Sequence, residues 1–174
     1  AVRKGNMDIS QMVQHLAEFY RISLNKGKNI LTVREEVNLL NHYLEIQKVR
    51  FADAVEVTYD LDEELLECRI IKLILQPVVE NAIHHAMREE NAVLHIHICL
   101  RRMPGTEDGQ GKMVFTITDD GMGMDEETVR DLNSEMQSAV HGFGLKNIVV
   151  RINMQYGAGY DVRVYSRNGE GSRI

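Results

Sequence analysis

Paired glycines after residue 100 constrain the fold more than any other feature of the sequence. Eleven of the 13 glycines lie there, and ten of these form five Gly-x-Gly pairs, at 109/111, 121/123, 142/144, 157/159 and 169/171. Glycine adopts positive φ and lets a ligand approach the backbone closely, so such pairs mark turns or ligand-lining loops. We expect simple turns at most of the pairs and a ligand at a minority.

Composition and charge exclude several classes of protein. Hydrophobic residues at 44% and charged residues at 26% are ordinary for a globular chain. The longest apolar stretch, residues 70–79, is interrupted by polar residues and proline, so no membrane span is expected. A net charge of −6 argues against a nucleic-acid partner, which normally needs a basic surface. Two cysteines are too few for a disulfide framework, which indicates a reducing cytosolic compartment.

The first 52 residues read as a helical hairpin. Apolar residues recur at steps of three and four over residues 9–20, and residues 25–29 then break the pattern. The capping-box pattern Thr32-x-x-Glu35 opens a second amphipathic helix. Two such helices cannot bury their apolar stripes alone, so we expect a partner helix from another subunit or from a preceding segment. The chain starts at Ala1, and we expect it to be a piece of a longer protein.

Residues 53–174 mix helices and strands without strict alternation. Alternating patterns predict strands at 55–59, 93–100, 113–118, 160–166 and from 172 onward, and helices at 73–87 and 145–156. The mixture favours an α+β class fold, an α/β sandwich with a mostly antiparallel sheet and helices on one face. The sequence therefore predicts two domains, residues 1–52 and 53–174.

Two common nucleotide motifs are absent. A phosphate loop needs a hydroxyl residue after its lysine, but Gly111 and Lys112 are followed by Met113. A dinucleotide fingerprint needs a third glycine where Asn147 follows the 142/144 pair.

A metal site is a weaker alternative. His95, His97 and Cys99 alternate along one expected strand and so share a face. Residues on one strand give poor tetrahedral geometry, and we expect the two histidines to face solvent while the intervening leucines and isoleucines form core.

Three segments have features that indicate a bound ligand. Residues 76–85 put Glu80 and Asn81 on an otherwise apolar helix, where unpaired polar groups are costly to bury. Residues 118–124 run from Asp119 at a strand end into the 121/123 glycine pair. Residues 141–147 lead a glycine loop into a helix start, whose free N–H groups favour an anion such as phosphate.

Together these segments resemble, in order and approximate spacing, the N, G1 and G2 boxes of one ATP-binding family. The family comprises histidine kinases, gyrase-type topoisomerases and Hsp90-type chaperones, whose Bergerat-type fold is a two-layer α/β sandwich. Residues 75–82, 144–147 and 156–157 look like sensor histidine kinases of the LytS/YesM type in particular. Residues 16–24, 34–36 and 43–50 resemble the helical domain of that family, so the resemblance covers essentially the whole chain.

The resemblance implies ATP and Mg²⁺ as cofactors and gives roles to individual residues. Asn81 would coordinate Mg²⁺, and Asp119 would accept a hydrogen bond from the adenine amino group. The 142/144 glycine loop would form a mobile lid, which with residues 125–141 should tighten on the nucleotide. The full set expected to bind nucleotide is Asn81, His84, His85, Asp119, Gly121, Gly123, Met124, Gly142, Phe143, Gly144, Leu145, Lys146 and Ser172.

Three positions depart from the family pattern. His84 replaces a lysine that would meet phosphate, and Asp120 replaces an asparagine and adds negative charge. Gln76 stands where ATPase relatives have a general-base glutamate, which argues against strong stand-alone hydrolysis. Gln76 and Glu80 are the candidate catalytic residues.

The function implied is the catalytic portion of a two-component sensor histidine kinase, a protein-histidine kinase. It would phosphorylate a histidine absent from this chain, since His15 and His42 lack the Pro-His-Phe context of the family's acceptor. A response regulator would then receive the phosphoryl group. The resemblance also implies a homodimer through the helical segment and a cytoplasmic location in a parent anchored to the inner or plasma membrane.

Two alternatives remain open. An anti-sigma-factor serine kinase has the same nucleotide fold, but the helical hairpin argues against it. A non-catalytic nucleotide-dependent scaffold is suggested by His84 and Asp120.

Overall fold

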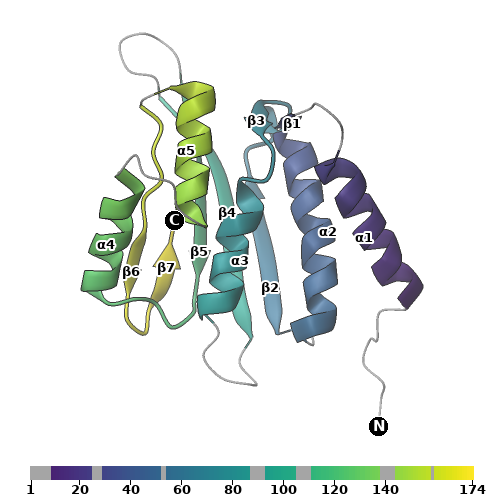
Figure 1. Ribbon diagram of the computed structural model, residues 1–174, viewed down its shortest axis with the longest axis horizontal. Helices are drawn as coiled ribbons and strands as arrows, with labels where there is room; N and C mark the ends of the chain where they lie inside the picture. The colour runs from purple at the N-terminus through teal and green to yellow at the C-terminus, as the bar shows by residue number, and fades with distance from the viewer. Residues whose placement is uncertain are drawn as a thin grey trace.

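The computed structural model describes residues 9–24, 29–51, 54–86, 93–104, 111–137, 144–157 and 159–174 (Figure 1). The helices are α1 (Ile9–Ser23), α2 (Val33–Phe51), α3 (Leu75–Ala86), α4 (Glu126–Gln137) and α5 (Leu145–Tyr156), with a 3-10 turn η1 (Glu63–Leu65). The strands are β1 (Ile30–Thr32), β2 (Val55–Leu61), β3 (Arg69–Ile71), β4 (Leu94–Met103), β5 (Lys112–Asp119), β6 (Tyr165–Arg167) and β7 (Gly171–Arg173).

Five of these strands form a mixed sheet in the order β2-β4-β5-β7-β6. The β2–β4 pair is parallel and the other pairs are antiparallel. Along β4 the side chains alternate strictly: Leu94, Ile96 and Ile98 are buried, whereas His95 and His97 are exposed. One face of the sheet is therefore covered by helices and the other meets solvent, which confirms the predicted sandwich. Figure 1 shows α3 and α5 side by side over the covered face.

The hairpin begins its second helix as the sequence predicts. Thr32 N–H donates to Glu35 Oε2 at 2.8 Å, and Glu35 N–H donates to Thr32 Oγ1 at 3.1 Å, which completes the capping box. Strand β1 immediately before it pairs antiparallel with β3, an association the sequence did not indicate. This two-stranded sheet ties the start of α2 to the segment that leads into α3.

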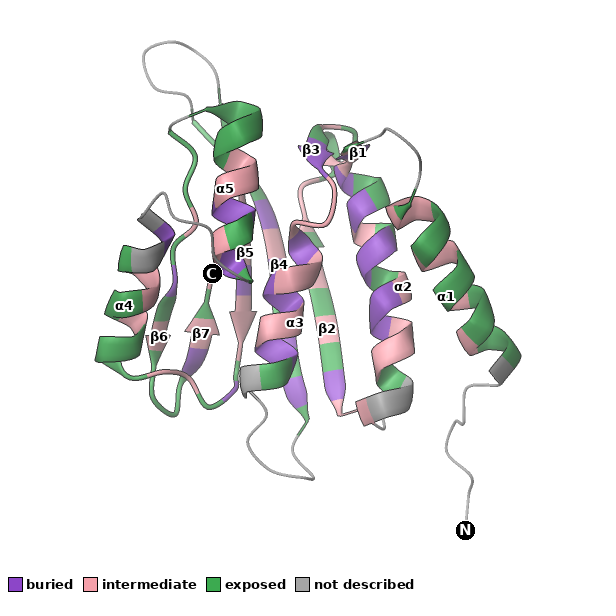
Figure 2. Ribbon diagram, viewed as in Figure 1, coloured by how far each residue is buried: buried purple, intermediate pink, exposed green. Residues whose placement is uncertain are grey.

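The hydrophobic core extends from α2 through the sheet to α5. Leu40, Tyr43 and Leu44 of α2 belong to the same buried cluster as residues of α3, β4 and α5, and Figure 2 shows the buried stripe of α2 on the side next to α3. The partner helix expected for this stripe is therefore supplied by α3 of the same chain. The stripe of α1 is different, because Val13, Leu16 and Tyr20 remain exposed.

The polar segment expected to be a lid contains a regular helix. Asp125 caps α4, since its Oδ1 accepts from Thr128 N–H at 2.8 Å; this bond lowers the pKa of Asp125. Asn133 fixes α4 to the chain before β6 with two hydrogen bonds to the backbone of Val164, at 2.8 and 3.0 Å. Residues 138–141 lie outside the described part of the chain.

The strand predicted at 160–166 is shorter in the structure. Only residues 165–167 form β6, and residues 161–164 pair with no strand. The backbone groups of Val164 are bonded to the side chain of Asn133, and the Val162 N–H donates to Asp161 Oδ1, in place of strand partners. Within the described residues, no helix is both long and apolar enough to cross a membrane.

Candidate functional site

Two of the three motif segments meet where α3 passes the start of α5. A Cβ built on Gly144 would lie 3.8 Å from Asn81 Nδ2 and 4.0 Å from Asn81 Oδ1. Gly144 has φ +65° and is the N-cap of α5, with no side chain bonded across the helix start. The absence of a side chain at Gly144 therefore leaves the Asn81 amide next to the first turn of α5. Free N–H groups at such a start favour an anion.

The residues that follow Gly144 have different surroundings. Leu145 is buried in the main core and fixes the first turn of α5 to the rest of the molecule. Lys146 is half-buried and places a cationic side chain in that same first turn. A lysine beside a helix start adds positive charge where the N–H groups already attract anions.

The third segment is held by the C-terminal strand. Asp119 ends β5 and lies opposite Ser172 of β7 in the ladder. Asp119 Oδ1 accepts from Gly121 N–H at 3.0 Å, which sets the turn after the strand. A Cβ on Gly171 would lie 2.0 Å from Asp119 O, so only glycine allows β7 to approach β5 this closely.

Ser166 connects the turn to the β6–β7 hairpin, and the sequence gave no signal for it. Its Oγ accepts from Met124 N–H at 2.9 Å, donates to Gly171 O at 2.7 Å and lies 3.0 Å from Ser172 Oγ. Gly123, at φ +67°, makes the same approach possible, because a Cβ there would lie 1.9 Å from Arg167 O. Asp119, Gly121, Gly123, Met124 and Ser172 are thus brought together.

Asp120 points away from this group. Its two carboxylate oxygens accept from His95 N–H and His95 Nδ1, each at 2.8 Å, on the neighbouring strand β4. Partial burial alone would raise the pKa of Asp120, but these hydrogen bonds outweigh it and hold that pKa below its usual value. The same carboxylate raises the pKa of His95. The negative charge added at Asp120 is therefore directed to His95 on the exposed face of the sheet.

His84 and Glu80 lie on a side of α3 that faces outward. His84 Nε2 is 4.0 Å from Glu80 Oε1, and both side chains are more than a third exposed. The His84 ring also lies 6.4 Å from the ring of Phe51, at the end of α2. Gln76, at the start of α3, has a buried Oε1 with no hydrogen-bond partner.

Three of the expected residues cannot be placed. The side chain of His85 and the whole of Gly142 and Phe143 lie outside the described residues. His15 and His42, set aside as acceptors, bond to each other across the hairpin with their Nδ1 atoms 3.0 Å apart.

The residues present fit a magnesium ion that would take one ligand from the protein and its other ligands from waters and phosphate oxygens. The Asn81 side chain offers an amide oxygen, a hard donor of the kind Mg²⁺ prefers, next to Gly144 at the start of α5. Within the described ranges no group of three or more His, Cys, Asp or Glu side chains could hold a metal ion, which includes His95, His97 and Cys99. Mg²⁺ commonly binds through one or two protein groups together with waters and phosphates.

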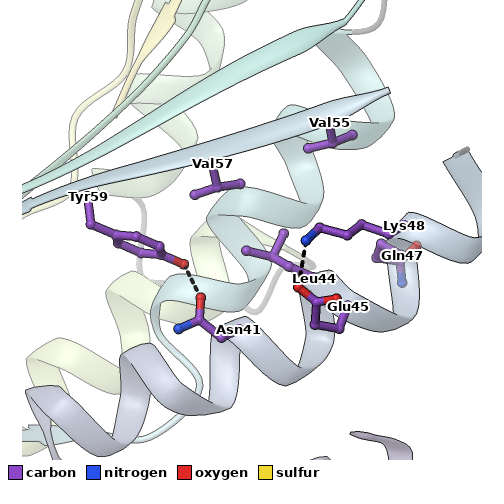
Figure 3. A pocket seen from close by; sticks show the side chains of 8 residues that line it. All are labelled: Asn41, Leu44, Glu45, Gln47, Lys48, Val55, Val57 and Tyr59. Atoms are coloured by element: carbon purple, nitrogen blue, oxygen red, sulfur yellow. Dashed lines mark hydrogen bonds and ion pairs between the residues drawn. The ribbon is translucent and has the colours of Figure 1, made fainter. Parts of the chain in front are cut away.

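Two cavities lie elsewhere in the molecule. A small one separates α2 from β2 (Figure 3), where Tyr59 O–H donates to Asn41 Oδ1 at 2.6 Å and burial raises the pKa of Tyr59 to about 12. A larger, mainly apolar cavity of about 880 Å³ lies between β3, β5 and the C-terminal end of α5, where Tyr156 lines it. Asn81, Asp119 and Gly144 line neither cavity.

Comparison with known families decides what this arrangement belongs to. The profile described as histidine kinase-, DNA gyrase B-, and HSP90-like ATPase matches residues 67–174, and a histidine kinase profile matches residues 1–55. The chain belongs to the histidine kinases of this ATPase family. The resemblance carried by the three motif segments is thereby confirmed, and ATP is the nucleotide of the family.

Individual sensor kinases match over nearly the whole chain. Sensor histidine kinase YesM of Bacillus subtilis is 34% identical over 95% of this chain and 27% of its own length. Sensor protein kinase HptS of Staphylococcus aureus is 28% identical over 94% of this chain and 30% of its own length. The chain thus spans less than a third of the length of these relatives.

Solved structures agree on the fold. The catalytic domain of histidine kinase ThkA superposes with a TM-score of 0.55 at 17% identity, over 83% of this chain and 90% of that one. Histidine kinase AdeS of Acinetobacter baumannii gives a TM-score of 0.51 at 13% identity, over 95% of this chain and 75% of that one.

Proposed function

We propose that this chain binds Mg·ATP between α3, the start of α5 and the end of β5, and presents the γ-phosphoryl group to a histidine of the parent kinase. The observation that supports this best is the meeting of Asn81 with Gly144 and of Asp119 with Ser172. These are the residues to which the family pattern gives metal, lid and adenine roles.

Each part of the site has a chemical task in this proposal. The Asp119 carboxylate accepts a hydrogen bond from the adenine amino group. The glycines of the turn, Gly121 and Gly123, let the base approach the backbone closely. The start of α5 offers N–H groups to the phosphates, and Asn81 would hold Mg²⁺, which neutralises charge on them. Phosphoryl transfer depends mainly on positioning and charge neutralisation, so no general base is required of Gln76 or Glu80.

The relatives and the exposed residues of α1 support a wider assignment. The histidine kinase ThkA has been crystallised in complex with the response regulator protein TrrA, and we propose a response regulator as the final acceptor here. The exposed apolar residues of α1, among them Val13, Leu16 and Tyr20, support a homodimer through the helical segment. We also propose the domain division at residue 52, supported by profiles that end at 55 and begin at 67, and a cytoplasmic location in a membrane-anchored parent.

The adenine assignment is tested by Asp119→Asn, with Asp120→Asn as the matched control. An amide can present a donor where the carboxylate presents only acceptors. Losing a charge-assisted bond in the site should cost about 1.5–3 kcal/mol, or roughly ten- to hundredfold in ADP affinity. The control should bind ADP as the unchanged chain does, because the Asp120 carboxylate faces His95. Calorimetry that finds equal ADP affinity in Asp119→Asn and the unchanged chain removes Asp119 from the site.

The kinase assignment is tested with γ-labelled ATP. The 174-residue chain should bind Mg·ATP without labelling itself, and the full-length parent should acquire an acid-labile label that passes to its response regulator. A persistent, acid-labile label on the 174-residue chain alone would contradict the proposal that the acceptor histidine lies outside it. A parent that binds nucleotide but never transfers phosphate would be a scaffold.

A further inference from the structure

The short segment that leads from the end of β3 into the first residue of α3, residues 71–75, is bound by elements that lie far apart in the sequence. Lys72 N–H donates to Asn29 O at 3.0 Å, and Lys72 Nζ donates to Ser23 O at 2.8 Å, at the end of α1. Ile71 N–H donates to the Tyr156 hydroxyl at 2.9 Å, at the end of α5. We call residues 71–75 the junction segment.

Glu36 of α2 makes the most concentrated of these contacts. Its side chain accepts from the N–H groups of Leu73, Ile74 and Leu75, at 2.8, 2.8 and 3.1 Å. Glu36 is only 1% exposed, the one buried charged residue in the described part of the chain. N–H groups at a helix start have no partner within the helix, and a carboxylate there also meets the positive end of the helix dipole. Helix α3 is therefore capped by a side chain from the hairpin.

The backbone of the junction segment is held in an unusual conformation. Leu73 has φ +59°, the only positive φ of a non-glycine residue in the described ranges. Such a conformation persists only where surrounding contacts enforce it. Glu36 binds the N–H group of Leu73, and Arg151 of α5 donates from its guanidinium to Leu73 O at 2.9 Å and to Lys72 O.

Both helices of the nucleotide site are thus anchored at one point. Asn81 lies six residues after Leu75 on α3, about 9 Å along a helix axis. Gly144 lies seven residues before Arg151, at the other end of the same stretch of α5, about 10 Å along its axis. A helix moves nearly as a rigid rod, so a loss of the cap at the start of α3 would let Asn81 shift relative to Gly144 on α5.

We infer that Glu36 is a positioning residue that sets the nucleotide affinity by holding the first turn of α3, and with it Asn81, in place. This inference rests on the proposed function, since it concerns the geometry of that site. Arg151 would hold α5 to the same segment.

The test compares Glu36→Gln with Val33→Ala. The glutamine amide keeps one acceptor oxygen but turns an N–H group toward one of the three backbone donors, so the cap is broken on one side. Val33 is fully buried three residues earlier on α2, and truncating it loosens the same helix without touching the cap. Calorimetry with Mg·ADP should show about five- to tenfold weaker binding for Glu36→Gln, at the low end of measured coupling between sites. Val33→Ala should bind Mg·ADP as the unchanged chain does, although the loss of buried side-chain atoms should lower its melting temperature.

A second readout follows Asn81 directly and does not need nucleotide. In ¹⁵N-labelled chain, Glu36→Gln should shift the side-chain amide resonance of Asn81 and speed exchange of the first α3 amides, and Val33→Ala should do neither. Arg151→Lys keeps the charge but lacks the guanidinium that donates to two carbonyl groups. It should also weaken Mg·ADP binding and shift the Asn81 resonance, and it replaces Glu36→Gln in the test if that variant does not fold.

The outcomes are separable. If the unchanged chain binds no Mg·ADP, the proposed function fails, and the Asn81 resonance alone decides the role of Glu36. If Glu36→Gln is folded with unchanged ADP affinity and an unchanged Asn81 resonance, the inference is overturned. It is also overturned if Val33→Ala weakens ADP binding as much as Glu36→Gln, because Glu36 would then act only through general stability.

Discussion

The β6–β7 hairpin offers a controlled measurement of how closely β7 must approach β5. Gly169 and Gly171 have nearly the same φ, at +84° and +85°. A Cβ on Gly169 would meet nothing within 4 Å, whereas a Cβ on Gly171 would lie 2.0 Å from Asp119 O. Gly169→Ala therefore adds backbone strain alone, and Gly171→Ala adds the same strain and a collision with the strand that carries Asp119.

The expected magnitudes follow from this difference. The left-handed conformation costs an alanine about 1–2 kcal/mol, and both variants share this loss. To relieve its collision, Gly171→Ala must also move β7 away from β5. The two backbone hydrogen bonds between Ile117 and Ile174, each 2.8 Å, are the next rungs of that pairing. At about 1 kcal/mol net for each bond, the total for Gly171→Ala comes to about 3–4 kcal/mol.

The assay is urea unfolding followed by far-ultraviolet circular dichroism, since the chain has no tryptophan. ADP affinity is measured beside it, and only Gly171→Ala should lose it, because Asp119 and Ser172 separate only there. Equal loss of unfolding free energy in the two variants, with ADP binding kept in both, would refute the idea that the close β5–β7 approach matters.

Two further predictions concern contacts made by single side chains. Asn133→Ala should lower the free energy of unfolding by about 1–3 kcal/mol and speed hydrogen exchange in α4, because it removes the two bonds from the Asn133 side chain to the buried backbone of Val164. Arg130→Ala, at an exposed position on the same helix, should do neither. Equal effects of the two variants would contradict this role of Asn133. The raised pKa of His95 means that its pairing with Asp120 stabilises the fold below the unfolded pKa of 6.5 and that this contribution is lost as pH rises through the folded pKa. Unfolding measured from pH 5 to 8 should therefore depend less on pH in Asp120→Asn, and an unchanged slope would show that the pair contributes nothing.

Much of the fold could be predicted because its signals are local. The helix predicted at 145–156 is α5, residue for residue, and the Thr32–Glu35 capping box forms as its spacing indicates. The alternation along β4 correctly separated core residues from solvent-facing histidines. Each of these depends on periodicity or on groups three residues apart, which sequence displays directly.

The elements that were missed depend on contacts between distant residues. Nothing in the sequence distinguishes Glu36 from other acidic residues of an amphipathic helix, and only its approach to residues 73–75 makes it a cap. Ser166 stood in an expected strand, with nothing to indicate its bond to Met124. Asp120 was expected to add charge near the nucleotide, and its partner His95 lies on another strand.

The order of strands in the sheet has a consequence for how the chain acquires its site. Neighbours β4 and β5 are joined by a short connection, so their ladder can form early in folding. The pairing of Asp119 with Ser172 links residues that are far apart in sequence, and such non-local pairings are slow to form. Because chains are synthesised from the N-terminus, the adenine side of the site cannot be complete before residues 171–173 have been made. A partly synthesised or partly folded chain would therefore hold Asn81 and Gly144 without being able to select adenine.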